Sequence, residues 1–420
     1  MINLDLTNLE KIDPAHGISK EELSSKESLI PAYLEKIKNR DQGFYTVIDE
    51  EAPIAKIEEY AMKVRGKYSH IVVLGIGGSS LGTICLQQSL LHLYQNELKT
   101  TSAPRLHVLD NIDPVLLKEL EDVIDYSKTL FIVVTKSGTT PEILAQYHYF
   151  RKQIEKHSLE PKEHLAFVTD PEKGTLRDIA NIENIPAFEI PENIGGRFSV
   201  LTAVGLLPAK LIGLDIRALI EGAKEMRDNF LQTSNNLAFQ IAAIQHTLGE
   251  KGKTMNVMMP YAQKLIRFAD WYRQLLAESI GKKFNDAGEE VFVGLTPINA
   301  LGVTDQHSQS QLYNEGPNDK LLIFLENKDA NIDLEIPELY EGTTFKKLLD
   351  IELKATADSL TKNDRPNFKI QVESVTEESI GQLFMLMEGA TAFLGEFYGI
   401  NAFDQPGVEL SKELTRKALL

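Results

Sequence analysis

Two short polar segments have the composition expected of an anion-binding loop. Residues 75–82 (GIGGSSLG) follow the apolar run 70–74, and a glycine-rich turn between a strand and a helix lets backbone N–H groups approach an anion at the positive end of the helix dipole. Residues 135–140 (TKSGTT) hold four hydroxyl side chains and Lys136 directly before Pro141. A helix cap alone needs one Ser or Thr, whereas this set of donors suits a phosphate dianion. We therefore expect a phosphate site, with a tight turn that binds nothing as the alternative for 75–82.

The glycine-rich segment does not match a nucleotide-binding fingerprint. The third glycine of a dinucleotide motif would fall at Ser80, and the acidic residue that ends the next strand, Asp110, lies much farther from Gly75 than the ~20 residues expected. Residues 252–254 (GKT) match the tail of a P-loop, but Thr247 stands where the first glycine belongs and the segment precedes a strand. The sequence therefore favours neither a nicotinamide cofactor nor a nucleoside triphosphate.

Several charged or polar side chains farther along the chain are candidates for catalysis. Arg197 follows two glycines and opens an apolar segment, a position that suits the stabilisation of a developing oxyanion. Glu278 follows an apolar run near the expected C-terminus of a helix, where the helix dipole disfavours a carboxylate; a general base and an ordinary surface glutamate both remain open. His307 lies in a polar run, and no two histidines have the spacing of metal ligands, so we expect no metal site. Gln405 and Lys412 lie one to two turns apart where the last helix begins.

The composition narrows the class of protein. The 420 residues carry 44 Lys and Arg against 61 Asp and Glu, a net charge of −17, and one cysteine. Such an acidic chain lacks the basic face that non-specific binding to nucleic acid or anionic lipid requires, and one cysteine excludes a disulfide framework and a cysteine-based metal centre. No stretch approaches the ~18 apolar residues of a membrane span, and the acidic N-terminus does not resemble a signal peptide. We expect a soluble cytoplasmic protein that binds neither nucleic acid nor membrane.

The spacing of apolar runs predicts the elements that must position these residues. Short apolar runs alternate with helical patterns in the first half of the chain, which is typical of a doubly wound α/β sheet. The expected strands there are 70–75, 105–110, 129–135, 164–169 and 187–190. The expected helices cover about 80–95, 114–124, 141–157 and 174–182.

After Pro191 the pattern changes to a second α/β unit with more helix. Its expected helices cover about 199–213, 216–230, 235–249, 262–280, 376–399 and 407–418, with a further helix beginning near Thr304. Its strand-like runs are 254–259, 290–294, 320–326 and 368–373. We therefore predict a smaller first domain at 41–190 with the phosphate loops, and a larger second domain at 191–420, joined by the N-terminal segment 1–40.

Six segments, taken together and in this order, resemble the phosphoglucose isomerase (glucose-6-phosphate isomerase) family. They are 74–82 (LGIGGSSLG), 135–142 (TKSGTTPE), 194–208 (IGGRFSVLTAVGLLP), 273–282 (RQLLAESIGK), 304–312 (TDQHSQSQL) and 403–414 (FDQPGVELSKEL). The resemblance implies two doubly wound, flavodoxin-like α/β/α sugar-isomerase (SIS) domains with additional N- and C-terminal helices. It also implies the interconversion of glucose 6-phosphate and fructose 6-phosphate in glycolysis and gluconeogenesis, without a metal or cofactor.

The same resemblance implies a role for each matching residue. The phosphate would be bound by the backbone of Gly78 and by Ser79, Thr135, Lys136, Ser137 and Thr140. Glu278 would move the proton between C1 and C2, and Arg197 would stabilise the cis-enediolate. The ring-opening pair would be His307 and Lys412, with Gln274 and Gln405 lining the sugar. The family is typically a homodimer in which the neighbouring subunit supplies His307, so the active site would be shared between subunits.

Two other functions compete with this reading. Another SIS-type isomerase, acting on an amino-sugar or heptose phosphate, would share the phosphate loops but should lack the segment 403–414. A non-catalytic sugar-phosphate sensor would need an output module, and no basic helix-turn-helix segment is visible. A sensor would also have no use for a base, an oxyanion clamp and a ring-opening pair together.

Overall fold

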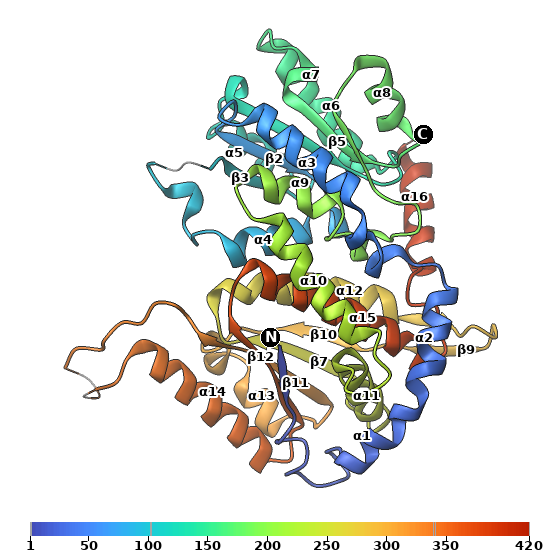
Figure 1. Ribbon diagram of the computed structural model, residues 1–420, viewed down its shortest axis with the longest axis vertical. Helices are drawn as coiled ribbons and strands as arrows, with labels where there is room; N and C mark the ends of the chain where they lie inside the picture. The colour runs from blue at the N-terminus through green and yellow to red at the C-terminus, as the bar shows by residue number, and fades with distance from the viewer. Residues whose placement is uncertain (1, 101–102, 339, 341, 420) are drawn as a thin grey trace. The chain divides into compact units, whose positions relative to one another are not determined.

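A computed structural model of the chain describes two compact units (Figure 1). The described residues are 2–100, 103–338, 340 and 342–419. The first unit comprises Gly43–Lys224 and Thr376–Phe384, and the second comprises Met1–Gln42, Glu225–Val375 and Met385–Leu420. The chain thus crosses between the units more than once, and the domain limits expected from the sequence stay a prediction.

The first unit is built on a parallel sheet of five strands. These are β2 (His70–Leu74), β3 (Arg105–Leu109), β4 (Thr129–Val134), β5 (Leu165–Thr169) and β6 (Ala187–Glu189). Their order is β3-β2-β4-β5-β6, and every neighbouring pair is parallel. All residues of β2, β4 and β5 are buried, as continuous apolar runs predict for strands covered on both faces. The doubly wound prediction is confirmed here, with the flavodoxin-like strand order.

Helices cover both faces of this sheet. They are α3 (Glu51–Val64), α4 (Leu81–Leu90), α5 (Pro114–Glu121), α6 (Pro141–Lys156), α7 (Pro161–His164), α8 (Thr175–Glu183), α9 (Ala203–Leu211) and the start of α10 (Ile216–Phe230). Helix α6 begins at Pro141, whose fixed φ suits a first helical position. Its buried Ile143, Tyr147 and Phe150 recur at helical spacing and pack with the sheet residue Phe131 in one apolar core.

The second unit repeats this strand order. Its sheet contains β1 (Asn3–Asp5), β7 (Met255–Pro260), β10 (Thr296–Asn299), β11 (Lys320–Asp329) and β12 (Asn367–Ser374). The order is β1-β12-β11-β7-β10, in which β1 is antiparallel and the other pairs are parallel. When the antiparallel β1 is left out and the sheet is followed from its other edge, the order is β10-β7-β11-β12. Ranked by position in the chain, these strands have the same order as β3-β2-β4-β5 of the first unit. Both units therefore have the doubly wound topology that places ligands outside the carboxyl ends of the strands.

The helices of the second unit include one that the sequence analysis missed. They are the end of α10, α1 (Lys20–Lys26), α2 (Ile30–Asn39), α11 (Leu237–Glu250), α12 (Ile266–Ile280), α13 (Ser310–Glu315), α14 (Phe345–Lys362), most of α15 (Glu377–Tyr398) and α16 (Glu409–Leu419). Helix α14 was not predicted because charged residues interrupt its apolar positions, and only Leu353, Thr356, Ala357 and Leu360 are buried. The helix expected from Thr304 is a short 3-10 turn, Thr304–His307, followed by α13.

The strand expected at 290–294 forms, but outside the main sheet. It is β9 (Glu290–Val293), which pairs with β8 (Lys282–Phe284) in a two-stranded antiparallel ribbon. The sheet position is taken instead by β10, a short edge strand that contains Pro297. Proline is tolerated at a sheet edge but weakens the sequence signal of a strand.

A search of the described helices for a membrane-spanning segment finds none with the necessary length and apolarity.

Glu388 in α15 carries a prediction about stability. It is buried, and neither carboxylate oxygen has a hydrogen-bond partner among the described residues. Burial raises the pKa of Glu388 well above 4.5, so the folded chain keeps a proton that the unfolded chain releases. The contribution of Glu388 to the free energy of unfolding is therefore largest below pH 4.5. It falls by about 1.4 kcal/mol per pH unit as the pH rises from there toward the folded-state pKa.

We expect Glu388→Gln to remove this pH dependence. Thermal unfolding at pH 5 and at pH 8 should show the melting temperature of the variant rising relative to wild type as the pH increases. Glu378→Gln is the matched control, because Glu378 lies exposed on the same helix and should leave the wild-type pH dependence in place. Parallel curves for wild type and Glu388→Gln would show that Glu388 does not hold a proton in the folded state.

Candidate active site

Both expected phosphate loops of the first unit lie at the carboxyl ends of adjacent strands. The first follows β2 and contains a 3-10 turn, Gly77–Ser79, before α4 begins. The second follows β4 and runs from Thr135 to Thr140 before α6 begins. Strands β2 and β4 pair directly, and the strand order reverses at this point of the sheet. This is the position at which open α/β sheets bind ligands.

The hydroxyl groups of the second loop converge on one another. Thr135 Oγ1 lies 2.8 Å from Thr140 Oγ1, and Ser137 Oγ lies 3.4 Å from the same atom. Thr140 is the N-cap residue of α6, yet its side chain makes no capping hydrogen bond. The hydroxyl is therefore turned into the loop, and capping does not account for it. The three hydroxyls form a compact set of donors beside the N-terminus of a 16-residue helix.

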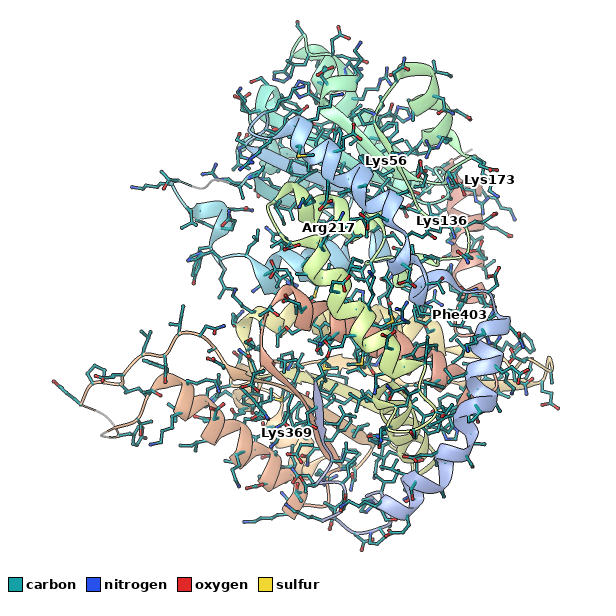
Figure 2. All side chains as sticks on the ribbon, in the orientation of Figure 1. Lys56, Lys136, Lys173, Arg217, Lys369 and Phe403 are labelled. Carbon is teal, nitrogen blue, oxygen red and sulfur yellow. The ribbon has the colours of Figure 1, made fainter. Side chains whose placement is uncertain are left out.

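The ammonium of Lys136, a residue labelled in Figure 2, binds the segment that precedes Arg197. Its Nζ donates to the carbonyl oxygens of Glu192, at 2.6 Å, and Ile194, at 2.9 Å. Burial of this half-buried side chain lowers the pKa of Lys136. Lys136 thus ties the hydroxyl loop to the segment that leads into Arg197, and its contact with a phosphate stays a prediction.

Arg197 lies against the glycine-rich loop. It is 4% exposed and belongs to the 3-10 turn Gly196–Phe198, with its guanidinium 5.6 Å from the centre of the Phe198 ring. A Cβ atom on Gly78 would lie 2.3 Å from the carbonyl carbon and oxygen of Gly196 and 2.7 Å from the Arg197 nitrogen. The two loops therefore meet backbone to backbone at Gly78, which only glycine permits. Ser79, in the same turn, is half-buried.

Gly78→Ala tests this close approach. The added methyl group meets main-chain atoms that cannot move aside, so we expect the free energy of unfolding to fall by about 1–3 kcal/mol and the binding of a sugar phosphate to weaken. Thermal unfolding and the KM for fructose 6-phosphate measure the two effects. Gly196→Ala is the stability control, because no atom lies within 4 Å of its Cβ position among the described residues. Equal stability of the two variants would contradict the predicted clash.

The second unit holds the other five predicted residues. Gln274 and Glu278 lie one turn apart on α12, and Gln274 Nε2 donates to Glu278 Oε1 at 3.2 Å. Both side chains are half-buried. This hydrogen bond gives the carboxylate a defined orientation. The structure therefore brings together the predicted base and one predicted sugar ligand.

The remaining three residues lie exposed on their own elements. His307 ends the 3-10 turn Thr304–His307. Gln405 precedes a further 3-10 turn, and Lys412 Nζ lies 2.7 Å from Glu409 Oε1 on α16. An exposed ion pair within one helix contributes little to stability, so the Lys412 ammonium can leave Glu409 for another partner at little cost.

One residue near Glu278 was missed by the sequence analysis. Lys282 is 7% exposed, and its Nζ donates to the carbonyl oxygens of Glu278 and Ser279, both at 2.8 Å. It also lies 3.7 Å from Asp404 Oδ1, next to Gln405. The sequence did contain a sign of this role, because Lys282 directly follows Gly281, the C-cap of α12. Lysines near the C-terminus of a helix can donate to its last carbonyl groups.

The described part of the chain contains no group of three or more His, Cys, Asp or Glu side chains that could hold a metal ion.

Comparisons with known proteins place these features in a family. The family model described as phosphoglucose isomerase matches residues 55–325 and 346–419. A glucose-6-phosphate isomerase from Carboxydothermus hydrogenoformans is 47% identical over 410 residues, covering 92% of this chain and 87% of that protein. One from Rubrobacter xylanophilus is 36% identical over 428 residues, covering 99% and 97%.

Two crystal structures are similar over nearly the whole chain. A hypothetical protein from Thermus thermophilus has a TM-score of 0.90 at 34% identity, with 100% of each chain covered. A glucose-6-phosphate isomerase from Chlamydia trachomatis has a TM-score of 0.84 at 23% identity, covering 96% of this chain and 86% of that one, and shows the shared fold. The family model matches most of the chain, and two relatives are more than 30% identical over most of its length. The chain therefore belongs to the phosphoglucose isomerase family.

Proposed function

We propose that this chain is a glucose-6-phosphate isomerase, which interconverts glucose 6-phosphate and fructose 6-phosphate. The observation that carries the proposal is the hydroxyl loop 135–140, which lies at the switch point of the first sheet and is tied by Lys136 to the segment before Arg197. A family of this name and relatives named for this activity support the same substrate. The enzyme would act in the cytoplasm, in glycolysis and gluconeogenesis.

The phosphate group is assigned to the two loops of the first unit. The hydroxyls of Thr135, Ser137 and Thr140, with Ser79 and the N–H of Gly78, would donate to its oxygens, and the N-terminus of α6 favours the negative charge. Because the phosphate is remote from the reacting carbons, its binding energy can hold the sugar in register for the chemical step. Lys136 would add a positive charge at the edge of this site.

The proton transfer is assigned to Glu278. A carboxylate held by Gln274 can remove the proton from one of the two carbons, C1 or C2, and return it to the other. The enediolate formed in between carries a negative oxygen, which Arg197 would stabilise with a preorganised charge. His307 and Lys412 would open the sugar ring by moving protons between the ring oxygen and the hydroxyl, and Gln405 would bind the sugar.

A homodimer completes the proposed site. His307 lies exposed on its own unit, which leaves it available to a second copy of the chain. In this proposal the neighbouring subunit supplies His307, so the dimer is the active form. We also propose that the two α/β units correspond to the two SIS domains.

The test is a coupled assay of the purified protein with fructose 6-phosphate in the presence of EDTA. Formation of glucose 6-phosphate that EDTA does not abolish supports the proposal. A protein that turns over only an amino-sugar or heptose phosphate would belong to the alternative isomerase class. A protein that binds fructose 6-phosphate without converting it would be a sensor.

A further inference from the structure

The lysine that follows helix α12 is buried in an unusual setting. Lys282 is 7% exposed, and its ammonium donates to the carbonyl oxygens of Glu278 and Ser279, both at 2.8 Å. The carboxylate of Asp404 lies 3.7 Å from the same nitrogen. Its neighbour Lys283 points elsewhere, because successive strand residues face opposite sides, and pairs with Glu290 at 2.9 Å.

Lys282 provides hydrogen bonds for two carbonyl groups at the end of α12. The last four carbonyl groups of a helix have no partner within it. Here the Gly281 N–H binds the Ala277 carbonyl, and the Lys282 ammonium binds the next two. A positive charge at this end also offsets the negative end of the helix dipole. Burying an ammonium is unfavourable unless it is fully hydrogen-bonded, so these bonds hold the helix end in one position.

We infer that Lys282 is a positioning residue for the proposed base, Glu278. It binds the main-chain carbonyl of that residue and, through Asp404, links it to the segment that carries Gln405. This inference rests on the proposed function. A displacement of about 1 Å in a reacting group can lower a rate by about 10²-fold. Loss of the lysine frees the last turn of α12 and lets the carboxylate of Glu278 move away from the sugar carbons.

A double-mutant cycle tests whether Lys282 acts through Glu278. Lys282→Met keeps the length and the apolar stem but removes the donors. We expect it to lower kcat for fructose 6-phosphate by about 10–100-fold, with KM within about twofold, since the phosphate loops are untouched. In the Glu278→Gln background the same change should lower the residual rate by less than about threefold, because the base that it positions is already lost.

The cycle has a matched control variant, and several results would overturn the inference. Lys283→Met should leave kcat unchanged, because Lys283 is exposed and pairs with a surface glutamate. Equal losses from Lys282→Met in both backgrounds would make the lysine merely structural and overturn the inference, as would an unchanged kcat. If Lys282→Met does not fold, Lys282→Gln, which keeps one donor, replaces it in the cycle. Failure of both to fold would assign Lys282 to the stability of the whole unit and equally overturn the inference.

Wild-type turnover, measured first, separates this inference from the proposed function. No turnover of fructose 6-phosphate by the wild-type protein overturns both. Normal wild-type turnover, together with a large loss in Glu278→Gln and none in Lys282→Met, leaves the proposed function standing and overturns only the role of Lys282.

Discussion

Glu278→Gln is expected to lower kcat for the interconversion of fructose 6-phosphate and glucose 6-phosphate by about 10²–10⁴-fold, the range of a general base. The amide has nearly the same shape as the carboxylate and can keep a hydrogen bond to Gln274, which lies one turn away. It cannot accept a proton from carbon. The loss should therefore fall on the chemical step and leave substrate binding nearly unchanged. Coupled assays in both directions, with calorimetric titration of fructose 6-phosphate, measure the two quantities.

The matched control for this prediction is Glu290→Gln. Glu290 is an exposed carboxylate in the same unit and pairs with Lys283, so its neutralisation should leave kcat within about twofold of wild type, as expected for a surface site. Near-normal turnover by Glu278→Gln would remove Glu278 from the mechanism. Loss of substrate binding together with turnover would show that Glu278 acts on binding instead of on proton transfer.

Arg197→Met is expected to lower kcat by about 10²–10³-fold, the loss that follows removal of one preorganised donor from a developing oxyanion. Arg197 is buried, and its backbone packs against Gly78 of the glycine-rich loop. The charge is thus fixed in place before the enediolate forms, and no solvent must reorganise around it. Methionine keeps an unbranched apolar side chain but loses the charge and the guanidinium contact with Phe198. Steady-state kinetics with fructose 6-phosphate and thermal unfolding check the result.

Two further variants sharpen the test of Arg197. Arg197→Lys keeps the charge but loses the planar fork and the stacking on Phe198, so it should recover only part of the activity. Arg217→Met is the control: Arg217 is an exposed arginine of the same unit, and it pairs with Glu51 and Glu58. Its loss should change stability little and leave kcat near wild type. An Arg197→Met variant that folds and retains full kcat would contradict the assigned role.

The elements that carry the phosphate loops could be predicted from the sequence because their strands are covered on both faces. The runs HIVVL and TLFIVV are apolar at nearly every position and form β2 and β4 within one residue of the expected limits. Other elements were not predicted, among them helix α3 (Glu51–Val64). Strands β1 and β10 were missed because they lie at sheet edges and are only three and four residues long. In α14 charged residues interrupt the apolar ones, and few of its side chains are buried.

The sequence could name candidate residues for the site, but it could not show the contacts between them. The hydroxyl loop and Arg197 were identified from residue type and spacing. The sequence could not show that the Lys136 ammonium binds two carbonyl groups, because this depends on where residues 192–194 return in space. For the same reason Lys282 was missed. Its role is visible only when the helix end and Asp404 are seen around one nitrogen.

The net charge of −17 contrasts with the few positive side chains assigned to the site. The proposed substrate is an anion, and the overall charge should slow its approach. The cations assigned to it are few and local: Arg197 is buried in the first unit, Lys136 is half-buried beside the hydroxyl loop, and Lys412 is exposed on α16. Binding is therefore expected to depend on these local groups.

The most direct test of the central claim is proton NMR of fructose 6-phosphate incubated with the wild-type protein in D₂O containing EDTA. A base that moves a proton through an enediolate exchanges it with solvent in some turnovers, and repeated turnover accumulates the label. The account predicts that glucose 6-phosphate forms, that deuterium collects at its C2 and at C1 of fructose 6-phosphate, and that Glu278→Gln slows both processes together. Failure to form glucose 6-phosphate, or its formation without any deuterium after long incubation, would contradict the account.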